Sequence, residues 1–548
     1  MRNRLHERRP DRVGDALTWL CGGALSVSLI LIVGLLVVLA WHGLGYFWQE
    51  RLTALDLRDG SKVVGEILER EALPGQPPGP DGLVPQRIRV KVGNRDLTGS
   101  DFRWIDEADI VSRSEPRDVL LLERLEWGNF HGFVHELKRG DEILARGDDA
   151  WPALRKLVAE KAEERDALER LEKHELGSVN YAIEKERLAE RRLALEAPPE
   201  PERSRREAAI VAETQTLQAR YDALAAQLVE ARKKLLAETV VLVAADGTQK
   251  EMPVGAIVRA VEPNRIGFGG RLRLYLSRVW EFVSANPRES NTEGGIFPAI
   301  FGTVMMVLLM SIFVMPFGVI AAVYLREYAK GGVIVRLVRI AVNNLAGVPS
   351  IVFGVFGLGF FVYLIGGTVD QLFHPEALPT PTYGTGGILW ASLTLALLTV
   401  PVVIVSAEEG LAAVPKAVRE GSLALGATKF ETLWRVVLPA AAPGILTGLI
   451  LALSRAAGEV APLMIVGMVK LAPSLPLDGN FPFVHFERKF MHLGFHIYDV
   501  GFQSPNVEAA KPLVFATALL LILVVLSTNL LAILVRNHLR QKYATRSI

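Results

Sequence analysis

The chain has 548 residues, a formal net charge of +1, and hydrophobic residues at 50% of its positions. Its mean hydropathy of +0.27 is too high for a soluble protein with 22% charged residues, unless charged and apolar residues occupy separate segments. The near-zero net charge gives no bulk case for nucleic-acid binding, and the single cysteine, Cys21, excludes an intramolecular disulfide and a multi-cysteine metal site.

The N-terminus predicts an uncleaved membrane anchor. Residues 1–16 form a basic segment, and the apolar run 17–41 that follows is about as long as the roughly 20 residues needed to span a bilayer. A secretory signal has a shorter apolar core and a cleavage site of small residues. The apolar run is followed by a cluster of aromatic residues that ends at Trp48, as is typical of the membrane–water interface. We expect a first transmembrane helix within 17–48 and a cytoplasmic N-terminus.

Residues 49–290 contain no spanning segment and are expected in the periplasm. Short alternating runs separated by Gly, Pro and Asn turns predict a small β domain from 51–125, and 239–265 has the same character and is expected to pair with it. Residues 271–283 predict an amphipathic helix at the periplasmic membrane surface.

Residues 151–238 predict a helical hairpin inserted in that β domain. Leucines and alanines recur at helical spacing in a highly charged background, and a Pro-rich break at 197–201 separates two arms. Arms of roughly 45 and 35 residues would reach about 50–70 Å from the base. Gly177 and Ser178 mark a candidate kink in the first arm. A solvated stalk and a partner-binding arm are both compatible with this pattern.

Residues 291–540 predict a five-helix core, followed by a tail at 541–548. Apolar runs occupy 297–324, 334–365, 387–406, 440–468 and 511–535. Lysines and arginines cluster after the second, fourth and sixth spans, on the same side as the basic N-terminus, as the positive-inside rule requires for six spans. Both termini are therefore expected in the cytoplasm.

The polar stretch 407–439 lies between the fourth and fifth spans. Small side chains at Gly421 and Ser422 would allow close approach of another helix, and Gly426 can adopt the positive φ that ends a helix. Thr428 and Glu431 have capping-box spacing, and a proline suits the first turn of the next helix. The stretch predicts helix, glycine turn and helix, a rigid knob on the membrane surface. The residues of interest are Glu420, Gly421, Ser422, Gly426, Leu438 and Pro439.

This spacing resembles the EAA loop of ABC importer permeases, which reads Glu-Ala-Ala, three residues, Gly, nine residues, Ile, one residue, Leu-Pro. Gly421 and Ser422 stand where that pattern has alanines. The Gly-Gly-Ile-x-Pro run at 294–298 and the segments 343–350 and 455–459 narrow the resemblance to the phosphate permease family, PstA. The resemblance is weak over 17–45 and close over 290–540, so 49–290 is an insertion between the first two spans. It implies an α-helical membrane protein of the type I ABC importer permease kind.

The fifth span contains two opposite charges, Arg455 and Glu459, which are four residues apart and so share one helix face. An unpaired charge at mid-bilayer costs about 3 to above 10 kcal/mol, so such residues usually face a cavity or a partner. Arginine offers a fork of donors suited to phosphate oxygens. Either the two side chains line a translocation path, or they form an intrahelical ion pair in which each only neutralises the charge of the other. The resemblance implies that these charges line the translocation path. Because Glu459 would repel phosphate, we assign it to gating or to orienting Arg455, and not to direct binding.

Asn343, Asn344 and Ser350 fall in the predicted third span, where their side chains either line a pore or take part only in helix packing. Two histidine pairs, 131 with 135 and 492 with 496, have helical metal-ligand spacing without the glutamate of His-Glu-x-x-His. Ordinary histidines are the favoured interpretation, so we expect no metal site. The chain has no Gly-x-x-x-x-Gly-Lys-Ser/Thr loop and no legible catalytic arrangement, so we expect neither ATP hydrolysis nor enzyme activity here.

The resemblance implies a permease subunit of an ATP-driven phosphate importer in a bacterial inner membrane, forming half of the translocation pathway. It implies four partners: a PstC-like permease, a PstB-like ATPase dimer that carries ATP and Mg²⁺ and receives the EAA loop, a periplasmic phosphate-binding protein, and membrane lipid. The alternatives are a permease for another oxyanion (sulfate, molybdate or a phosphonate) and a membrane-anchored periplasmic scaffold or sensor.

Overall fold

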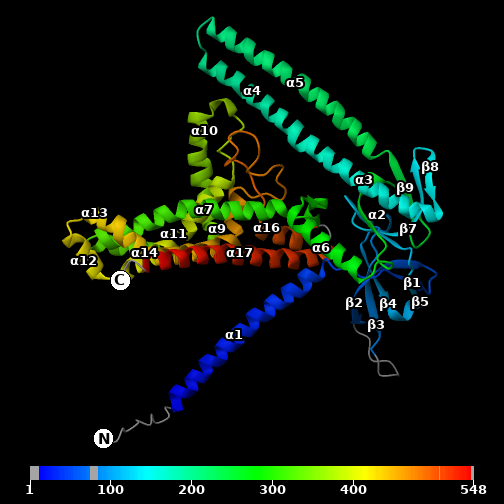
Figure 1. Ribbon diagram of the computed structural model, residues 1–548, viewed down its shortest axis with the longest axis horizontal. Coiled ribbons are helices and arrows are strands. Elements are labelled where there is room, and N and C mark those ends of the chain that lie inside the picture. Colours follow the sequence, from blue (N-terminus) through cyan, green and yellow to red (C-terminus); the bar gives the residue numbers. More distant parts are fainter. Residues whose placement is uncertain (1–11, 74–83, 505–506, 545–548) are drawn as a thin grey trace.

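The computed structural model describes residues 12–73, 84–504 and 507–544. Most of the basic segment 1–16 and the last part of the tail 541–548 lie outside the described residues. Within the described part, six helical segments are long and apolar enough to cross a bilayer, as the sequence predicts. Figure 1 shows a helix bundle with a β region at one end and a long helical hairpin rising from that region. We call the two ends of the bundle the β end and the knob end.

Four long helices form the bundle. The most buried is α11, which packs between α7 and α14, while α17 packs on α14. Their contact surface is an apolar cluster that includes the fully buried side chains of Met306, Leu395 and Ala456. The helices are α7 (Phe297–Val323), α11 (Ile388–Ala413), α14 (Leu438–Gly458) and α17 (Val507–Ala544).

The first membrane helix, α1 (Arg12–Gly45), leaves the bundle. It contacts α17 where Gly43 lies against the backbone of Phe515 and Ala516, and Figure 1 shows its N-terminal part diverging from the other helices. Its apolar side chains from Leu17 to Val38 are exposed in this chain. This surface must be covered by lipid or by another protein chain, because water does not solvate so long an apolar helix.

The predicted third span, 334–365, is wrong. Residues Val333–Leu345 form a separate short helix, α8, and the chain then turns through Gly347 and Pro349. The spanning segment is Ser350–Phe373, made of α9 (Ser350–Phe356), a π-helical stretch η7 (Gly357–Gly366) and α10 (Gly367–Phe373). Hydropathy assigned α8 to the span because this helix is mostly apolar, with a narrow polar stripe of Arg336, Arg339 and Asn343.

The predicted fifth span, 440–468, is also interrupted. Helix α14 ends at Gly458, Glu459 is extended (φ −80°, ψ 128°), and a second short helix, α15 (Ala461–Val466), follows. Pro462 lies in the first turn of α15, where its missing N–H costs nothing. Gly354 of α9 packs so closely on Pro462 that a Cβ added at Gly354 would lie 2.7 Å from the Cα of Pro462. The break is therefore built into the packing of α9 on α15.

The β region contains two antiparallel sheets. The first has the order β4-β3-β2-β1-β5 and the second β10-β9-β7-β6-β11, with β8 on the outer part of β7. The expected pairing of the two distant pieces is found only for β6, which pairs with β11; strands β1 to β5 form the first sheet by themselves, and β9 pairs with β7 beyond the predicted piece. The predicted boundary at 125 is wrong, since β7 and β8 extend the domain to 146. The strands are β1 Thr53–Leu57, β2 Lys62–Ala72, β3 Gln86–Lys91, β4 Phe102–Asp106, β5 Ile110–Ser114, β6 Leu120–Arg124, β7 Phe130–Arg139, β8 Glu142–Arg146, β9 Glu238–Val243, β10 Gln249–Pro253 and β11 Ile257–Val261.

The helical hairpin is confirmed. Its first arm comprises α3 (Ala150–Arg170), a π-helical turn η3 (Leu171–Leu176) beside the candidate kink, and α4 (Gly177–Glu196). The second arm is α5 (Glu202–Leu235), 34 residues or about 50 Å long. The base belongs to the β region, because Leu154 and Val158 of α3 lie in the core of the second sheet.

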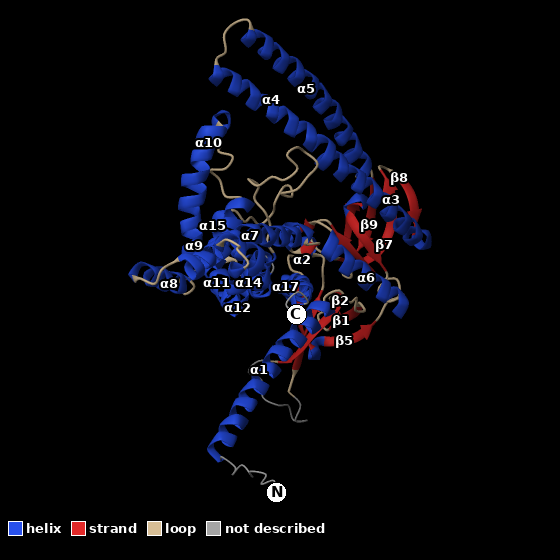
Figure 2. Cartoon of the chain, turned by 60° about the vertical axis from the view of Figure 1, so that its left-hand side comes forward, coloured by secondary structure: helices blue, strands red, loops and turns tan. Residues whose placement is uncertain are grey.

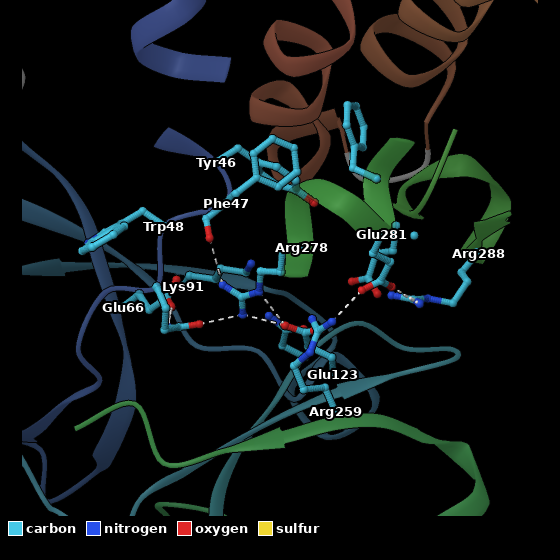
Figure 3. A pocket seen from close by; sticks show the side chains of 15 residues that line it. Tyr46, Phe47, Trp48, Glu66, Lys91, Glu123, Arg259, Arg278, Glu281 and Arg288 are labelled. Atoms are coloured by element: carbon cyan, nitrogen blue, oxygen red, sulfur yellow. Dashed lines mark hydrogen bonds and ion pairs between the residues drawn. The ribbon is translucent and has the colours of Figure 1, made fainter. Parts of the chain in front are cut away.

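The amphipathic helix predicted at 271–283 is α6 (Phe268–Ser284), with four exposed apolar residues at four-residue spacing: Phe268, Leu272, Leu276 and Trp280. Its other face forms a joint between the end of α1 and the second sheet, around a cavity of about 110 Å³ (Figure 3). Arg278 donates to Glu123 and Gln49, and Arg259 donates to Glu123 and Glu281. Burial alone would raise the pKa of Glu123, but Arg278 and Arg259 together lower it to about 2.

Candidate functional site

The charge pair predicted in the fifth span is formed. Arg455 lies in the last turn of α14, and its Nε is 3.6 Å from Oε1 of Glu459. The expectation of one continuous helix face is wrong, because Glu459 stands just past the helix end and is held there by the turn before α15. The two side chains are 33% and 21% exposed. A guanidinium carries five N–H donors, more than one carboxylate oxygen uses, so this arginine can bind an anion while remaining beside Glu459.

A polar contact next to this pair was missed by the sequence reasoning. Asn529 of α17 donates from Nδ2 to Oγ of Ser454 at 2.7 Å, and the Ser454 hydroxyl in turn donates to the carbonyl of Ile450. This bond joins α17 to α14 one residue before Arg455. Hydrogen bonds between membrane helices contribute about 0.6–2 kcal/mol. The contact therefore helps to fix the end of α14 that carries the arginine. An isolated Asn in the last long apolar run was the available signal.

The structure does not bring the other predicted path residues to the charge pair as one cluster. Ser350 begins α9, which packs on α15. Asn343 and Asn344 lie on α8, outside any spanning segment, so their placement in the third span is wrong. Asn343 instead lines a cavity of about 300 Å³ between α8, α11 and the end of α7, together with Arg326, Arg339, Glu408 and Glu409.

The segment 407–439 forms the predicted knob. Helix α12 (Lys416–Ala424) ends at a turn where Gly426 has φ +87°, and α13 (Lys429–Thr432) begins with the predicted capping box. Thr428 Oγ1 accepts from the Glu431 amide, and Glu431 Oε2 accepts from the Thr428 amide. Pro439 lies in the first turn of α14, which a π-helical stretch η9 (Leu433–Val437) joins to α13.

The small residues of the knob have different surroundings from those expected. Ser422 packs on α13 through a 3.0 Å hydrogen bond between its hydroxyl and that of Thr432. A Cβ added at Gly421 would meet nothing within 4 Å, so the close helix approach expected there does not occur within this chain. Glu420 is also exposed. This face of α12 is therefore left open.

Aromatic and aliphatic side chains project from the knob, and the sequence reasoning did not single them out. Leu425 is 91% exposed, and the rings of Phe430 and Trp434 stack at 6.3 Å, with both residues about two-thirds exposed. Exposed aromatic residues on a rigid support are typical of a protein-docking surface. Their four-residue spacing, 430 to 434, was the signal that could have identified them.

Two cations connect the knob to the end of α7. Arg419 pairs with Glu327 and donates to the carbonyl of Leu411, and Lys429 lies 4.5 Å from the ring centre of Tyr328. Glu327 and Tyr328 belong to η6 (Tyr324–Tyr328), the π-helical continuation of α7. A displacement of the knob would therefore act on α7 as well as on α14.

In the described part of the chain, no cluster of three or more potential metal ligands is found around either histidine pair. His131 lies in strand β7 and not in a helix. His492 and His496 flank and occupy α16 (Leu493–Tyr498), and both are buried. Burial lowers the pKa of each of these two imidazoles to about 4.

The chain is similar to known transport proteins over part of its length. A family profile described as "Binding-protein-dependent transport system inner membrane component" matches residues 314–544. A phosphate transport system permease protein, PstA 1, of Mycobacterium tuberculosis (strain CDC 1551) is 35% identical over 244 residues, which is 44% of this chain and 71% of that protein. PstA of Yersinia pestis is 33% identical over 251 residues, 46% of this chain and 75% of that protein.

Among solved structures, an inward-facing MetNI methionine ABC transporter chain matches with a TM-score of 0.33 and 20% identity, over 44% of this chain and 94% of that one.

Proposed function

Because the chain belongs to the family of binding-protein-dependent transport system inner membrane components, we propose that it is the permease subunit of an ATP-driven importer of inorganic phosphate. The observation that carries this proposal is the similarity to phosphate permeases over 71% and 75% of their length. The matched region includes the two features a permease subunit needs, a polar pair inside the bundle and a rigid knob at its end.

The proposed orientation places the knob end in the cytoplasm and the β region in the periplasm of a bacterial inner membrane. Basic residues concentrate at the knob end, on η6, α8, α12 and the last part of α17. This distribution supports the orientation through the positive-inside rule. Both termini are then cytoplasmic, and the hairpin and the two sheets face the compartment from which the substrate arrives.

Arg455 is the proposed substrate contact, with Glu459 as its orienting partner. In the empty state Glu459 balances the guanidinium. An arriving phosphate offers several anionic oxygens in place of one carboxylate oxygen, which favours transfer of the arginine to the substrate. Asn343, beside Arg339 and Glu408 in the cavity near the knob, is proposed to face the exit of the path, and Ser350 to lie along the path at the start of α9. We propose no catalytic role for any residue.

The surfaces that this chain leaves exposed support the proposed partners. Its exposed α1 and single set of five core helices support a second, PstC-like permease as the other half of the pathway. The open face of α12 and the exposed Phe430 and Trp434 support docking of the knob into a PstB-like ATPase, which would bind ATP and Mg²⁺. We propose that a periplasmic phosphate-binding protein delivers the substrate. We assign no cofactor to this chain.

Uptake of labelled phosphate tests the substrate. Cells that lack their own high-affinity importer would carry this chain together with its partner subunits. We expect uptake that excess unlabelled phosphate suppresses and that excess sulfate, molybdate or phosphonate leaves unchanged. Uptake of one of those anions in place of phosphate would contradict the proposed substrate while keeping the transporter class.

Affinity for the ATPase tests the knob. Trp434→Ala should weaken binding of the purified ATPase to the membrane subunits by about 30-fold, since a central aromatic anchor typically contributes about 2 kcal/mol. Trp280→Ala, an equally exposed tryptophan on α6 at the opposite end, is the matched control. Equal binding of both variants would show that the ATPase does not dock on Trp434. Absence of ATPase binding to the unaltered membrane subunits would favour a scaffold or sensor.

A further inference from the structure

The first arm of the hairpin does not stand free in solvent. Helix α4 passes over two loops that lie between it and the bundle, and Figures 1 and 2 both show α4 nearer to the bundle than α5. The Tyr181 hydroxyl donates to the carbonyl of Phe481 at 2.9 Å, and its ring lies edge-on to that of His485 at 6.0 Å. About three helical turns further along α4, Arg192 pairs with Glu376.

The ion pair at the far end of α4 is the strongest of these contacts. Glu376 is 3% exposed, in the short helix η8 (Pro375–Ala377). Burial alone would raise the pKa of this carboxyl, but the hydrogen bond from Arg192 outweighs burial and lowers it. Removing Arg192 would leave a buried carboxylate with a weakened set of partners. Because Arg192 is about half exposed while Glu376 is buried, this pair lies between a surface pair and a buried pair, and its loss costs more than the loss of a surface pair.

The two loops beneath α4 are bonded to each other. We call them the plate, residues 374–387 and 469–492. The Ile388 amide donates to the carbonyl of Arg488 at 2.9 Å, and the Leu389 amide to that of Phe486 at 3.1 Å. Gly387 lies so close to the backbone of Glu487 that a Cβ would come within 2.4 Å of its carbonyl oxygen. Contacts on either loop therefore constrain both.

The plate leads directly to the charge pair. Helix α15 begins two residues after Glu459 and runs into Gly467 and Met468, which forms a bridge with Phe490 of the plate. The Val469 amide also donates to the carbonyl of Phe490, at 3.0 Å. A shift of the plate would move α15 and, with it, the extended turn that holds Glu459 beside Arg455.

The other end of the hairpin is fixed to the β region. Lys161 of α3 is buried and pairs with Glu238 at the start of β9, and Arg165 donates to the carbonyls of Gly255 and Ile257. Because the base is embedded in the second sheet, α4 can transmit a restraint from that sheet to the plate.

We propose that α4 is a strap that holds the plate against the β region and thereby sets the position of the Arg455–Glu459 pair. Tyr181 and Arg192 are its positioning residues, and neither touches the substrate. The functional part of this inference rests on the proposed transport function, whereas the docking of α4 does not. The hairpin is then neither a free stalk nor only a docking arm for another protein.

Thiol crosslinking measures docking without transport. In a Cys21→Ser background, cysteines replacing Tyr181 and Phe481 should be joined by a short bifunctional thiol reagent in the intact membrane chain. A pair with one cysteine at Val211, on the exposed side of α5, should not react with the cysteine at 481. Absence of the first crosslink in the otherwise unaltered chain would overturn the strap.

A charge exchange measures positioning. Arg192→Glu should reduce the 181–481 crosslink by at least about tenfold, because it places two carboxylates together. Adding Glu376→Arg should restore it. Arg187→Glu is the matched control, since Arg187 lies on the same helix and pairs within it, with Glu184.

Two readouts then connect docking to the charge pair: labelling of a cysteine replacing Val460 by a water-soluble thiol reagent, and the maximal rate of phosphate uptake. We expect both to change in Arg192→Glu, to recover in the exchanged double variant, and to stay unchanged in Arg187→Glu. Loss of the crosslink without any change at position 460 would overturn the strap. If the unaltered chain imports no phosphate, the proposed function fails, and the labelling of position 460 still decides the strap.

Discussion

Glu123 is the residue on which the joint between α1, α6 and the second sheet depends. Its carboxylate accepts from both Arg278 and Arg259 in a buried position. We expect Glu123→Gln to lower the free energy of unfolding by about 3–5 kcal/mol, since it leaves two arginines without their common partner. Thermal unfolding of the purified chain in detergent measures this.

The matched control is Glu115→Gln, which removes the exposed partner of Arg51. Exposed pairs contribute about 0–1 kcal/mol, so this variant should unfold close to the unaltered chain. Equal losses in the two variants would show that the joint is not held by its charges.

His496 makes stability depend on pH. Its folded-state pKa is lowered by burial to about 4, from an ordinary value of 6.5, and neither ring nitrogen has a hydrogen-bond partner among the described residues. The unfolded chain therefore binds the proton first as pH falls. Stability is fully present above about pH 6.5 and is lost progressively down to about pH 4.

We expect His496→Phe to reduce the slope of the unfolding temperature between these two pH values, because one of the two buried rings with a lowered pKa then has no proton to gain; His492 keeps the rest of the slope. His174→Gln, which changes an exposed histidine on the hairpin, should keep the original slope. An unchanged slope in His496→Phe would assign the acid sensitivity to other groups.

At the scale of elements, the knob separates two roles of glycine. Gly426 has φ +87° and Gly421 lies within helix α12, yet an added Cβ would meet nothing within 4 Å at either position. Gly426→Ala should therefore destabilise the knob by about 1–2 kcal/mol through the backbone alone. Gly421→Ala should stabilise α12 by up to about 1 kcal/mol.

Hydrogen exchange of the amides of residues 416–432 measures both changes. The account predicts faster exchange in Gly426→Ala and slower or equal exchange in Gly421→Ala. Faster exchange in both variants would contradict the open surroundings of Gly421, because it would mean that an added methyl group at this position disrupts a contact of α12.

The knob could be predicted because its determinants are local: a turn glycine, a capping box and a proline within 20 residues or so of each other. The breaks at Pro349 and Glu459 could not. Each lies in an apolar run of spanning length, and each is stabilised by α9 packing on α15, a contact between segments about 100 residues apart. Hydropathy alone cannot distinguish one long helix from two short ones in contact. Asn343 was misplaced for this reason, whereas Arg455 and Glu459 were correctly paired because their contact is local.

At the scale of the whole molecule, the hairpin was predicted as a pair of helices but not as a strap. Its contact with the plate joins Tyr181 to Phe481 across 300 positions of the sequence, and no local pattern encodes such a contact. Nor did the sequence show that the hairpin base belongs to the β region. Deleting all of 151–238 would remove Leu154, Val158 and Lys161 from that domain.

A shorter deletion should leave the rest of the chain folded. Arg232 and Glu172 are paired across the two arms at 3.1 Å, so residues 173–231 can be replaced by a short Gly/Ser bridge between them. We expect normal membrane insertion and an unchanged unfolding temperature for the β region. We also expect the position of the plate to change, because α4 no longer contacts it. Loss of membrane insertion would contradict the idea that the outer hairpin is a self-contained unit.

Uptake of labelled phosphate by the complete transporter, with this chain unaltered or carrying Arg455→Ala at matched membrane levels, tests whether Arg455 contacts the substrate. We expect uptake by the unaltered chain and a loss of at least about a hundredfold in the variant, the effect of removing one charged hydrogen-bonding partner worth about 3 kcal/mol. Undiminished uptake in Arg455→Ala would show that the charge pair only neutralises itself and that the phosphate path lies elsewhere in the bundle.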